Sequence, residues 1–163
     1  HHVGAVQSEY SLSTRFPELG LLQKTKQLKT AFIAFSPVGR GLLTDKPPTP
    51  ERVKESPFLR VNPRFQEPNL SENILAVKGF QKLAKDYGLS TAGLAISWLI
   101  AKDEHIIPIP GTRSSMHLKE MIKGTEKKLT QTDLNEIEKT IPVGWAHGDR
   151  YSDIQWIGPE KYC

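Results

Sequence analysis

The sequence is poor in cysteine and has no long apolar run. Cys163 is the single cysteine among 163 residues, which excludes an internal disulfide framework and favours a reducing compartment. No apolar stretch approaches the roughly 20 residues that a membrane-spanning helix needs, and no signal-peptide pattern opens the chain. We therefore expect no membrane partner and a cytoplasmic location.

The sequence also lacks any block of five or six like charges. The net charge is +4, but 22 basic residues are mixed with 18 acidic ones, as on the solvated faces of helices. We therefore expect no nucleic-acid partner. His1 and His2 have no third candidate ligand nearby, so no metal site is expected either.

The segments that are present alternate between strand and helix patterns. The expected strands lie at 3–10, 30–35 and 106–109, and the expected helices at 17–29, 69–87, 91–102, 115–123 and 130–141, with caps at Asn69 or Ser71, at Ser90 and at Thr130. This order predicts an α/β fold with parallel βα units. Three parallel strands leave two edges unpaired, so the pattern indicates part of a larger sheet or barrel, with self-association through the open edges as one way to cover them.

Two further segments are irregular. Residues 44–68 contain six prolines, which exclude long regular elements, but Phe58 and Phe65 favour an ordered flap over a linker. The tail at 144–163 carries four aromatic residues, Trp145, Tyr151, Trp156 and Tyr162, and is expected to pack on the body of the domain.

The ends of two strands carry the most informative pattern. The apolar run at 31–35 opens into Ser36-Pro-Val-Gly-Arg-Gly41, and the run at 106–109 opens into Pro110-Gly-Thr-Arg-Ser114. Ligands of α/β folds bind at the carboxyl ends of strands, glycines allow a close backbone approach, and arginines neutralise anions. The pair predicts a site for a phosphate-bearing cofactor, with ordinary βα turns as the alternative.

Four motifs together resemble the aldo-keto reductases. They are Val6-Gln-Ser-Glu-Tyr10, Phe35-Ser-Pro-Val-Gly-Arg-Gly-Leu42, Ile109-Pro-Gly-Thr-Arg113 and Gly148-Asp-Arg-Tyr151, in the family's order across most of the chain. The resemblance implies a (β/α)8 TIM barrel that uses NADP(H) to reduce aldehydes and ketones. A barrel needs roughly 250 residues, so residues 1–143 would form its C-terminal βα units, incomplete, with 144–163 as the tail.

The resemblance also implies roles for individual residues. The expected cofactor-binding residues are Gln7 on the nicotinamide amide, Phe35 stacked on the nicotinamide ring, Ser36, Pro37, Gly39, Arg40, Gly41 and Leu42 around the pyrophosphate, Gly111, Thr112 and Arg113 at the 2′-phosphate, and His117 and Glu120 nearby. The family's catalytic Asp, Tyr, Lys and His find no counterpart here, so no catalytic residue is assigned.

Departures from the family pattern leave two functions open. His117 stands where arginine is common and Met121 where asparagine is usual, which predicts weaker binding of the 2′-phosphate. The first hypothesis is the cofactor-binding C-terminal portion of an NADP-dependent reductase, whose partner is a small carbonyl substrate in the intact enzyme. The alternative is a non-catalytic NADP-binding or regulatory module.

Overall fold

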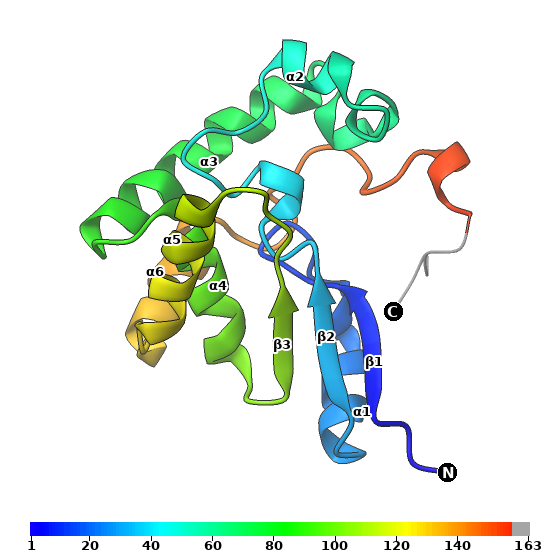
Figure 1. Ribbon diagram of the computed structural model, residues 1–163, viewed down its shortest axis with the longest axis vertical. Helices are drawn as coiled ribbons and strands as arrows, with labels where there is room; N and C mark the ends of the chain where they lie inside the picture. The colour runs from blue at the N-terminus through cyan, green and yellow to red at the C-terminus, as the bar shows by residue number, and fades with distance from the viewer. Residues whose placement is uncertain (158–163) are drawn as a thin grey trace.

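The computed structural model describes residues 1–157 and shows one sheet of three parallel strands (Figure 1). The strands are β1 (Ala5–Glu9), β2 (Ala31–Phe35) and β3 (Ile106–Ile109), in the order β1-β2-β3. The register places Glu9 beside Phe35 and Phe35 beside Ile109. All three strands therefore end at the same edge, where the loops that follow them meet.

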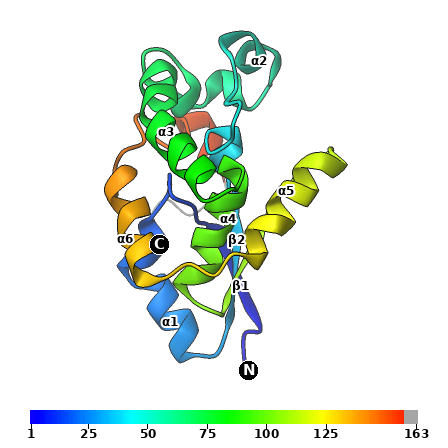
Figure 2. The same cartoon turned by 90° about the vertical axis from the view of Figure 1, so that its left-hand side faces the viewer.

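The sheet has one buried face and one open face. Phe32 and Ala34 point to the buried face and are fully enclosed, whereas Ile107 and Ile109 on the opposite face are 47% and 44% exposed. Figure 2 shows why, because helices α1 (Leu21–Gln27) and α4 (Thr91–Lys102) lie on one side of the strands. The open face of β2 and β3 is apolar, and β1 adds the polar Gln7 to it. An uncovered sheet face agrees with strands that belong to a larger sheet.

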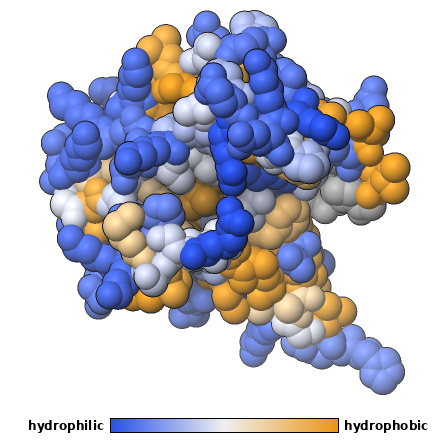
Figure 3. Space-filling view, turned by 45° about the horizontal axis from the view of Figure 1, so that its top comes forward, coloured by the Kyte–Doolittle hydropathy of each residue, from blue (hydrophilic) through white to orange (hydrophobic). Residues whose placement is uncertain are grey.

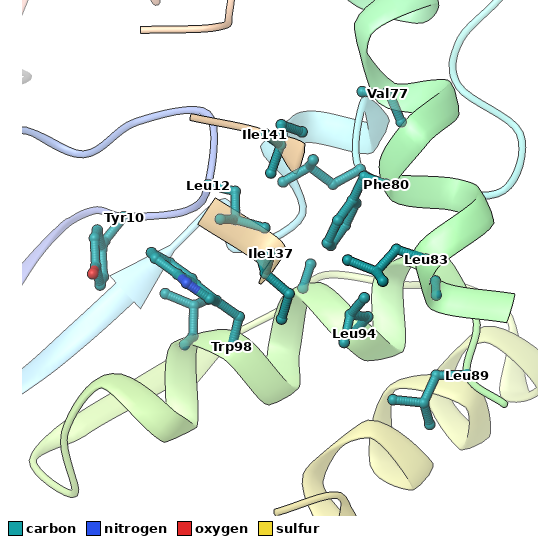
Figure 4. Close-up of a cluster of buried hydrophobic side chains, with 14 of the residues drawn as sticks. Tyr10, Leu12, Val77, Phe80, Leu83, Leu89, Leu94, Trp98, Ile137 and Ile141 are labelled. Atoms are coloured by element: carbon teal, nitrogen blue, oxygen red, sulfur yellow. The ribbon is translucent and has the colours of Figure 1, made fainter. Parts of the chain in front are cut away.

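The main core lies between the covered face of the sheet and the helices α3 (Asn69–Asp86), α4 and α6 (Gln131–Thr140) (Figure 4). Trp98 of α4 is fully buried, and Tyr10 lies against it with 5.4 Å between ring centroids. Burial and the hydrogen bond to Glu18 raise the pKa of the Tyr10 hydroxyl, so this core tyrosine stays neutral.

Helix boundaries follow the local sequence closely in the second half. Helix α4 and strand β3 have the predicted bounds, and the Ser90 side chain accepts a hydrogen bond from the amide of Gly93 as expected for a cap. Thr130 and Asp133 form the predicted capping box of α6. Helix α5 (Ser115–Glu126) continues slightly beyond its predicted end.

The prediction of one helix over 17–29 is wrong. Gly20, at φ 150°, separates a 3-10 turn at Phe16–Leu19 from α1, because that backbone conformation cannot continue a helix. The predicted side-chain cap of α3 is also absent: the helix begins at Asn69, directly after Pro68, without a capping hydrogen bond.

The proline-rich segment 44–68 contains only short helical pieces, as its prolines require. It holds α2 (Pro50–Glu55) and 3-10 turns at Leu59–Val61 and Pro63–Phe65. Phe65 is buried with Leu42 in a second apolar cluster, so the segment is ordered against the loop that follows β2.

The described part of the tail packs on the body. Trp145 is buried, and its indole Nε1 donates to the carbonyl oxygen of Leu12 at 2.8 Å. Tyr151 is also buried, and its ring lies 5.0 Å from that of Trp156. Tyr162 and Cys163, named in the sequence analysis, lie outside the described residues.

Candidate functional site

A cavity of about 1150 Å³ opens at the carboxyl ends of β2 and β3. Figure 3 shows a hollow on this side of the molecule, with hydrophilic residues around its rim and a hydrophobic area beside it. The residues that line the cavity come from the two loops predicted from the sequence, from the flap and from α5: Phe35, Ser36, Pro37, Val38, Arg40, Gly41, Thr44, Arg52, Ile109, Gly111, Thr112, Arg113, Ser114 and His117. Three arginines and no carboxylate line it, within the part of the chain that the structure describes.

The loop after β2 forms one wall. Its backbone is left-handed at Ser36 (φ 51°), Gly39 (φ 58°), Arg40 (φ 53°) and Gly41 (φ 98°). The left-handed conformation favours glycine at position 39, and a Cβ there would also lie 2.8 Å from the Ser13 hydroxyl oxygen, so the Ser13 side chain would have to move. The loop is therefore held tightly against the body of the domain.

The loop after β3 and the start of α5 form the opposite wall. The amide of Ser114 donates to the Thr112 hydroxyl oxygen at 3.1 Å, and the Ser114 side chain caps α5 by accepting from the amide of His117. Arg113 and His117 are exposed to solvent beside the cavity. Both side chains are accessible to an anionic ligand.

A second cavity, of about 530 Å³, adjoins the first and shares these lining residues with it: Val38, Gly41, Thr44, Arg52, Gly111, Thr112 and His117. Its lining adds apolar residues, Ala92, Met116 and Met121, and two carboxylates, Asp45 and Glu120. Asp45 already accepts hydrogen bonds from the backbone and side chain of Thr91. Together the two cavities form one site, with arginines on the walls of the first and a mixture of apolar and charged side chains, including Lys46, on the walls of the second.

The remaining predicted residues lie outside these cavities. Gln7 is exposed on the open face of β1, the same face as Phe35. Leu42 is fully buried in the second apolar cluster, and Gly39 is buried beneath its own loop. Leu42 and Gly39 therefore belong to the packing of the loop after β2, and Gln7 belongs to the open sheet face; none of the three lines a cavity wall.

A buried ionic cluster lies directly behind the loop after β2. Glu9 is fully buried and accepts two hydrogen bonds from the Arg40 guanidinium, at 3.1 Å and 2.7 Å, and one from the Thr14 hydroxyl at 3.0 Å. Arg150 lies 3.7 Å from the same carboxylate, and Arg64 donates to Thr14 at 2.8 Å. The Glu9 carboxylate thus pairs with Arg40 and Arg150 and is linked to Arg64 through the Thr14 hydroxyl.

Burial shifts the pKa of two members of this cluster. Burial, together with the neighbouring Arg40 and Arg150, lowers the pKa of Arg64 to about 10. Burial raises the pKa of the Tyr151 hydroxyl. That hydroxyl accepts a hydrogen bond from Arg40 at 2.6 Å, which connects the tail to the cavity wall.

Sequence reasoning missed several residues of this region. It assigned no role to Glu9, although the carboxylate lies inside a quoted motif, and none to Thr44 or Met116 on the cavity walls. Arg52 had one available signal, the positive character of the flap, and the structure places it on both cavity walls. The clustering of Arg64 and Glu9, far apart in sequence, has no local pattern that could have revealed it.

Other classes of site are not seen in residues 1–157. No group of three or more His, Cys, Asp and Glu side chains is arranged to hold a metal ion there. Over the same residues, every helix is too short or too polar to cross a lipid bilayer.

Comparison with known proteins identifies relatives of the chain. The sequence profile of the Aldo/keto reductase family matches residues 2–142. The chain is 35% identical over 151 residues to a probable aldo-keto reductase 1 of Glycine max, and covers 43% of that protein. It is 32% identical over 152 residues to the NADP(+) aldo-keto reductase yakc of Schizosaccharomyces pombe, and covers 45% of it. These matches include 93% and 91% of the present chain.

Solved structures confirm the fold. The glycerol dehydrogenase of Gluconobacter oxydans superposes with a TM-score of 0.70 at 21% identity, over 86% of this chain and 42% of that one. The chain therefore spans less than half the length of the relatives it matches. Its three-stranded sheet is an incomplete (β/α)8 barrel, as the sequence predicted. On this evidence the chain belongs to the aldo/keto reductase family.

Proposed function

We propose that this chain is the NADP(H)-binding portion of an oxidoreductase that reduces aldehydes or ketones to alcohols. The observation that supports it is the cavity at the carboxyl ends of β2 and β3, which Arg52 and Arg113 line without a lining carboxylate in the described residues, while the third lining arginine, Arg40, is paired with the buried Glu9 behind the wall. Such a charge balance suits a ligand with several phosphates. The relative named as an NADP(+) enzyme agrees with this ligand class.

The residues of the two cavities fit the parts of an elongated dinucleotide. Phe35 is half-buried beside the open sheet face, and its ring would stack on the nicotinamide ring and fix which face of that ring is presented to the substrate. Gln7 lies on the same sheet face and would hydrogen-bond the nicotinamide carboxamide. The loop Ser36–Gly41 would bind the pyrophosphate, and Gly111, Thr112 and Arg113 the 2′-phosphate. His117 and Glu120 would line the adenosine end.

The bound cofactor would supply the hydride, and this chain's residues would bind and orient it. Leu42, buried behind the loop, would fix the loop's position through packing. We assign no proton donor here, because the family's Asp, Tyr, Lys and His have no counterpart in the sequence. The small carbonyl substrate would approach over the open sheet face.

Equilibrium binding of NADPH and NADH to the complete gene product tests this proposal. Arg113→Ala should weaken NADPH binding about tenfold, corresponding to about 1.4 kcal/mol for one charge-assisted contact, and leave NADH within about twofold. Arg60→Ala is the matched control, because Arg60 is exposed on the flap away from the cavity lining. Failure of the wild-type protein to bind NADPH, or equal losses for both nucleotides, would refute the assignment.

A second candidate is a non-catalytic NADP-binding module that associates with copies of itself. The open face of the sheet favours it, because the exposed Ile107 and Ile109 lie on edge strand β3 and a partner could cover them. Light scattering and an assay of NADPH-dependent carbonyl reduction separate the candidates. A defined oligomer that binds NADPH without turnover supports the module, and turnover supports the reductase.

A further inference from the structure

The loop that follows β2 is held in a conformation that its own sequence does not favour. Ser36 and Arg40 are left-handed residues other than glycine, and Arg40 stands between two left-handed glycines. Such residues cost of order 1 kcal/mol each and persist only where surrounding contacts enforce the conformation. The contacts of the Arg40 side chain are therefore the place to look for what holds this wall of the cavity.

The Arg40 side chain points behind the loop, and its contacts reach three other segments of the chain. Both terminal nitrogens donate to the buried carboxylate of Glu9 on β1, and Nη2 also donates to the Tyr151 hydroxyl of the tail. The guanidinium carbon lies 4.9 Å from the ring centre of Phe58 in the flap and 4.6 Å from that of Tyr151. Only 12% of the side chain is exposed, although the residue lines the cavity.

These contacts occupy the groups with which Arg40 would otherwise bind a phosphate. A planar fork that meets a buried carboxylate with two hydrogen bonds is a well-defined geometry that lysine cannot reproduce. Removing Glu9 would leave the Arg40 guanidinium without its carboxylate partner in a largely buried position, and removing Arg40 would leave the buried Glu9 carboxylate with Arg150, at 3.7 Å, in place of two direct hydrogen bonds. The arrangement therefore suits a structural connection more than a direct contact with the ligand.

We propose that Arg40 is a positioning residue that couples nucleotide binding in the cavity to docking of the tail, residues 145–157, through Glu9 and Tyr151. The inference rests on the proposed function, since it assumes that the loop after β2 binds the nucleotide. A nucleotide that stabilises the ordered loop also stabilises the contact between Arg40 and Tyr151, and so the docked tail. By linkage, docking of the tail increases the affinity for the nucleotide by the same factor.

The test uses the complete gene product and makes two measurements. The first is the affinity for NADPH, and the second is the amide hydrogen exchange of residues 149–157 in the presence and absence of NADPH. Tyr151→Phe is the mildest change, because it removes the hydroxyl that accepts from Arg40 and keeps the ring. Arg40→Lys keeps the charge and removes the fork. Tyr87→Phe is the matched control, because the Tyr87 hydroxyl donates to Asp133 and Glu136, away from both cavities.

In the wild-type protein, NADPH should slow tail exchange about fivefold or more. Tyr151→Phe and Arg40→Lys should each reduce that protection and weaken NADPH binding about three- to tenfold, whereas Tyr87→Phe should change neither. A direct phosphate contact by Arg40 gives a different pattern, in which Tyr151→Phe has no effect and Arg40→Lys keeps most of the affinity.

The outcomes separate this inference from the proposal on which it rests. Nucleotide binding by the wild-type protein with unchanged tail exchange overturns the coupling alone. A silent Tyr151→Phe variant also overturns it. Absence of NADPH binding by the wild-type protein overturns the proposed function and the coupling together.

Discussion

The contact between α4 and α5 depends on two facing glycines, and Gly124→Ala should break it. A Cβ at Gly124 would lie 2.2 Å from the carbonyl oxygen of Gly93, a backbone atom that no side-chain rotation can move away. Ser97 supports the approach, because its hydroxyl lies within hydrogen-bond distance of the carbonyl oxygens of Gly93, at 3.0 Å, and Gly124, at 2.5 Å, and can donate its one proton to either. The helices would have to separate for the methyl group to fit.

The expected loss of unfolding free energy in Gly124→Ala is the difference between two opposing effects. Overpacking at a close contact costs about 3 kcal/mol, and replacing a helical glycine by alanine returns about 1 kcal/mol, so the net loss of unfolding free energy should be about 2 kcal/mol. For a chain of this size that corresponds to a melting temperature lower by about 4–8 °C. Since α5 carries His117 and Glu120, NADPH affinity should fall as well.

Gly79→Ala is the matched control for this prediction. Gly79 also lies in a helix, α3, but a Cβ there would meet only the Thr140 methyl group, at 3.3 Å. This variant should be neutral or more stable by up to about 1 kcal/mol. Urea unfolding followed by circular dichroism gives both values, and equal stabilities for the two variants would refute the argument from helix contact.

Two further predictions rest on individual charged side chains. For nucleotide binding, His117→Arg should raise the affinity for NADPH relative to NADH, because arginine carries a permanent charge for the 2′-phosphate, and an unchanged ratio would remove position 117 from the account. For acid stability, the hydrogen bond from Lys26, with a further one from His105, lowers the pKa of Asp103 to about 2. The ionised Asp103 therefore contributes to the free energy of unfolding above about pH 4, and this contribution is lost as the pH falls toward 2. Because Lys26 is largely exposed, Asp103→Asn should lower the free energy of unfolding by only about 1 kcal/mol at pH 5. Urea unfolding from pH 2.5 to 5 measures this loss, and the same pH dependence of stability in the variant and the wild type would contradict the prediction.

Local signals explain which parts of the fold were predictable. Helix α4 begins after a serine cap and is apolar nearly all round, so its bounds followed from the sequence. Helix α1 was predicted too long because its apolar spacing continued through Gly20, whose conformation only the folded chain reveals. The cap predicted at Asn69 or Ser71 failed because the chain enters α3 directly from a proline.

The candidate site was likewise predictable only in part. The convergence of Phe35, Gly111 and Arg113 on one cavity was predictable, because parallel strands end at a common edge. The association of Glu9 with Arg40 was not, since a charged residue in a strand motif gives no indication of its partner in a distant loop. Whether the residues around the cavity bind NADP(H) stays a prediction.

The hydrogen bond from Trp145 to Leu12 has a consequence for how the protein is made. The indole that closes the core follows Leu12 by 133 residues in the chain, so it is synthesised long after the carbonyl that it binds. A nascent chain has its strands and the helices before residue 145 available before this indole emerges from the ribosome. During that interval the apolar interior beside Leu12 is accessible to chaperones, and a chain truncated just before Trp145 would leave it so permanently.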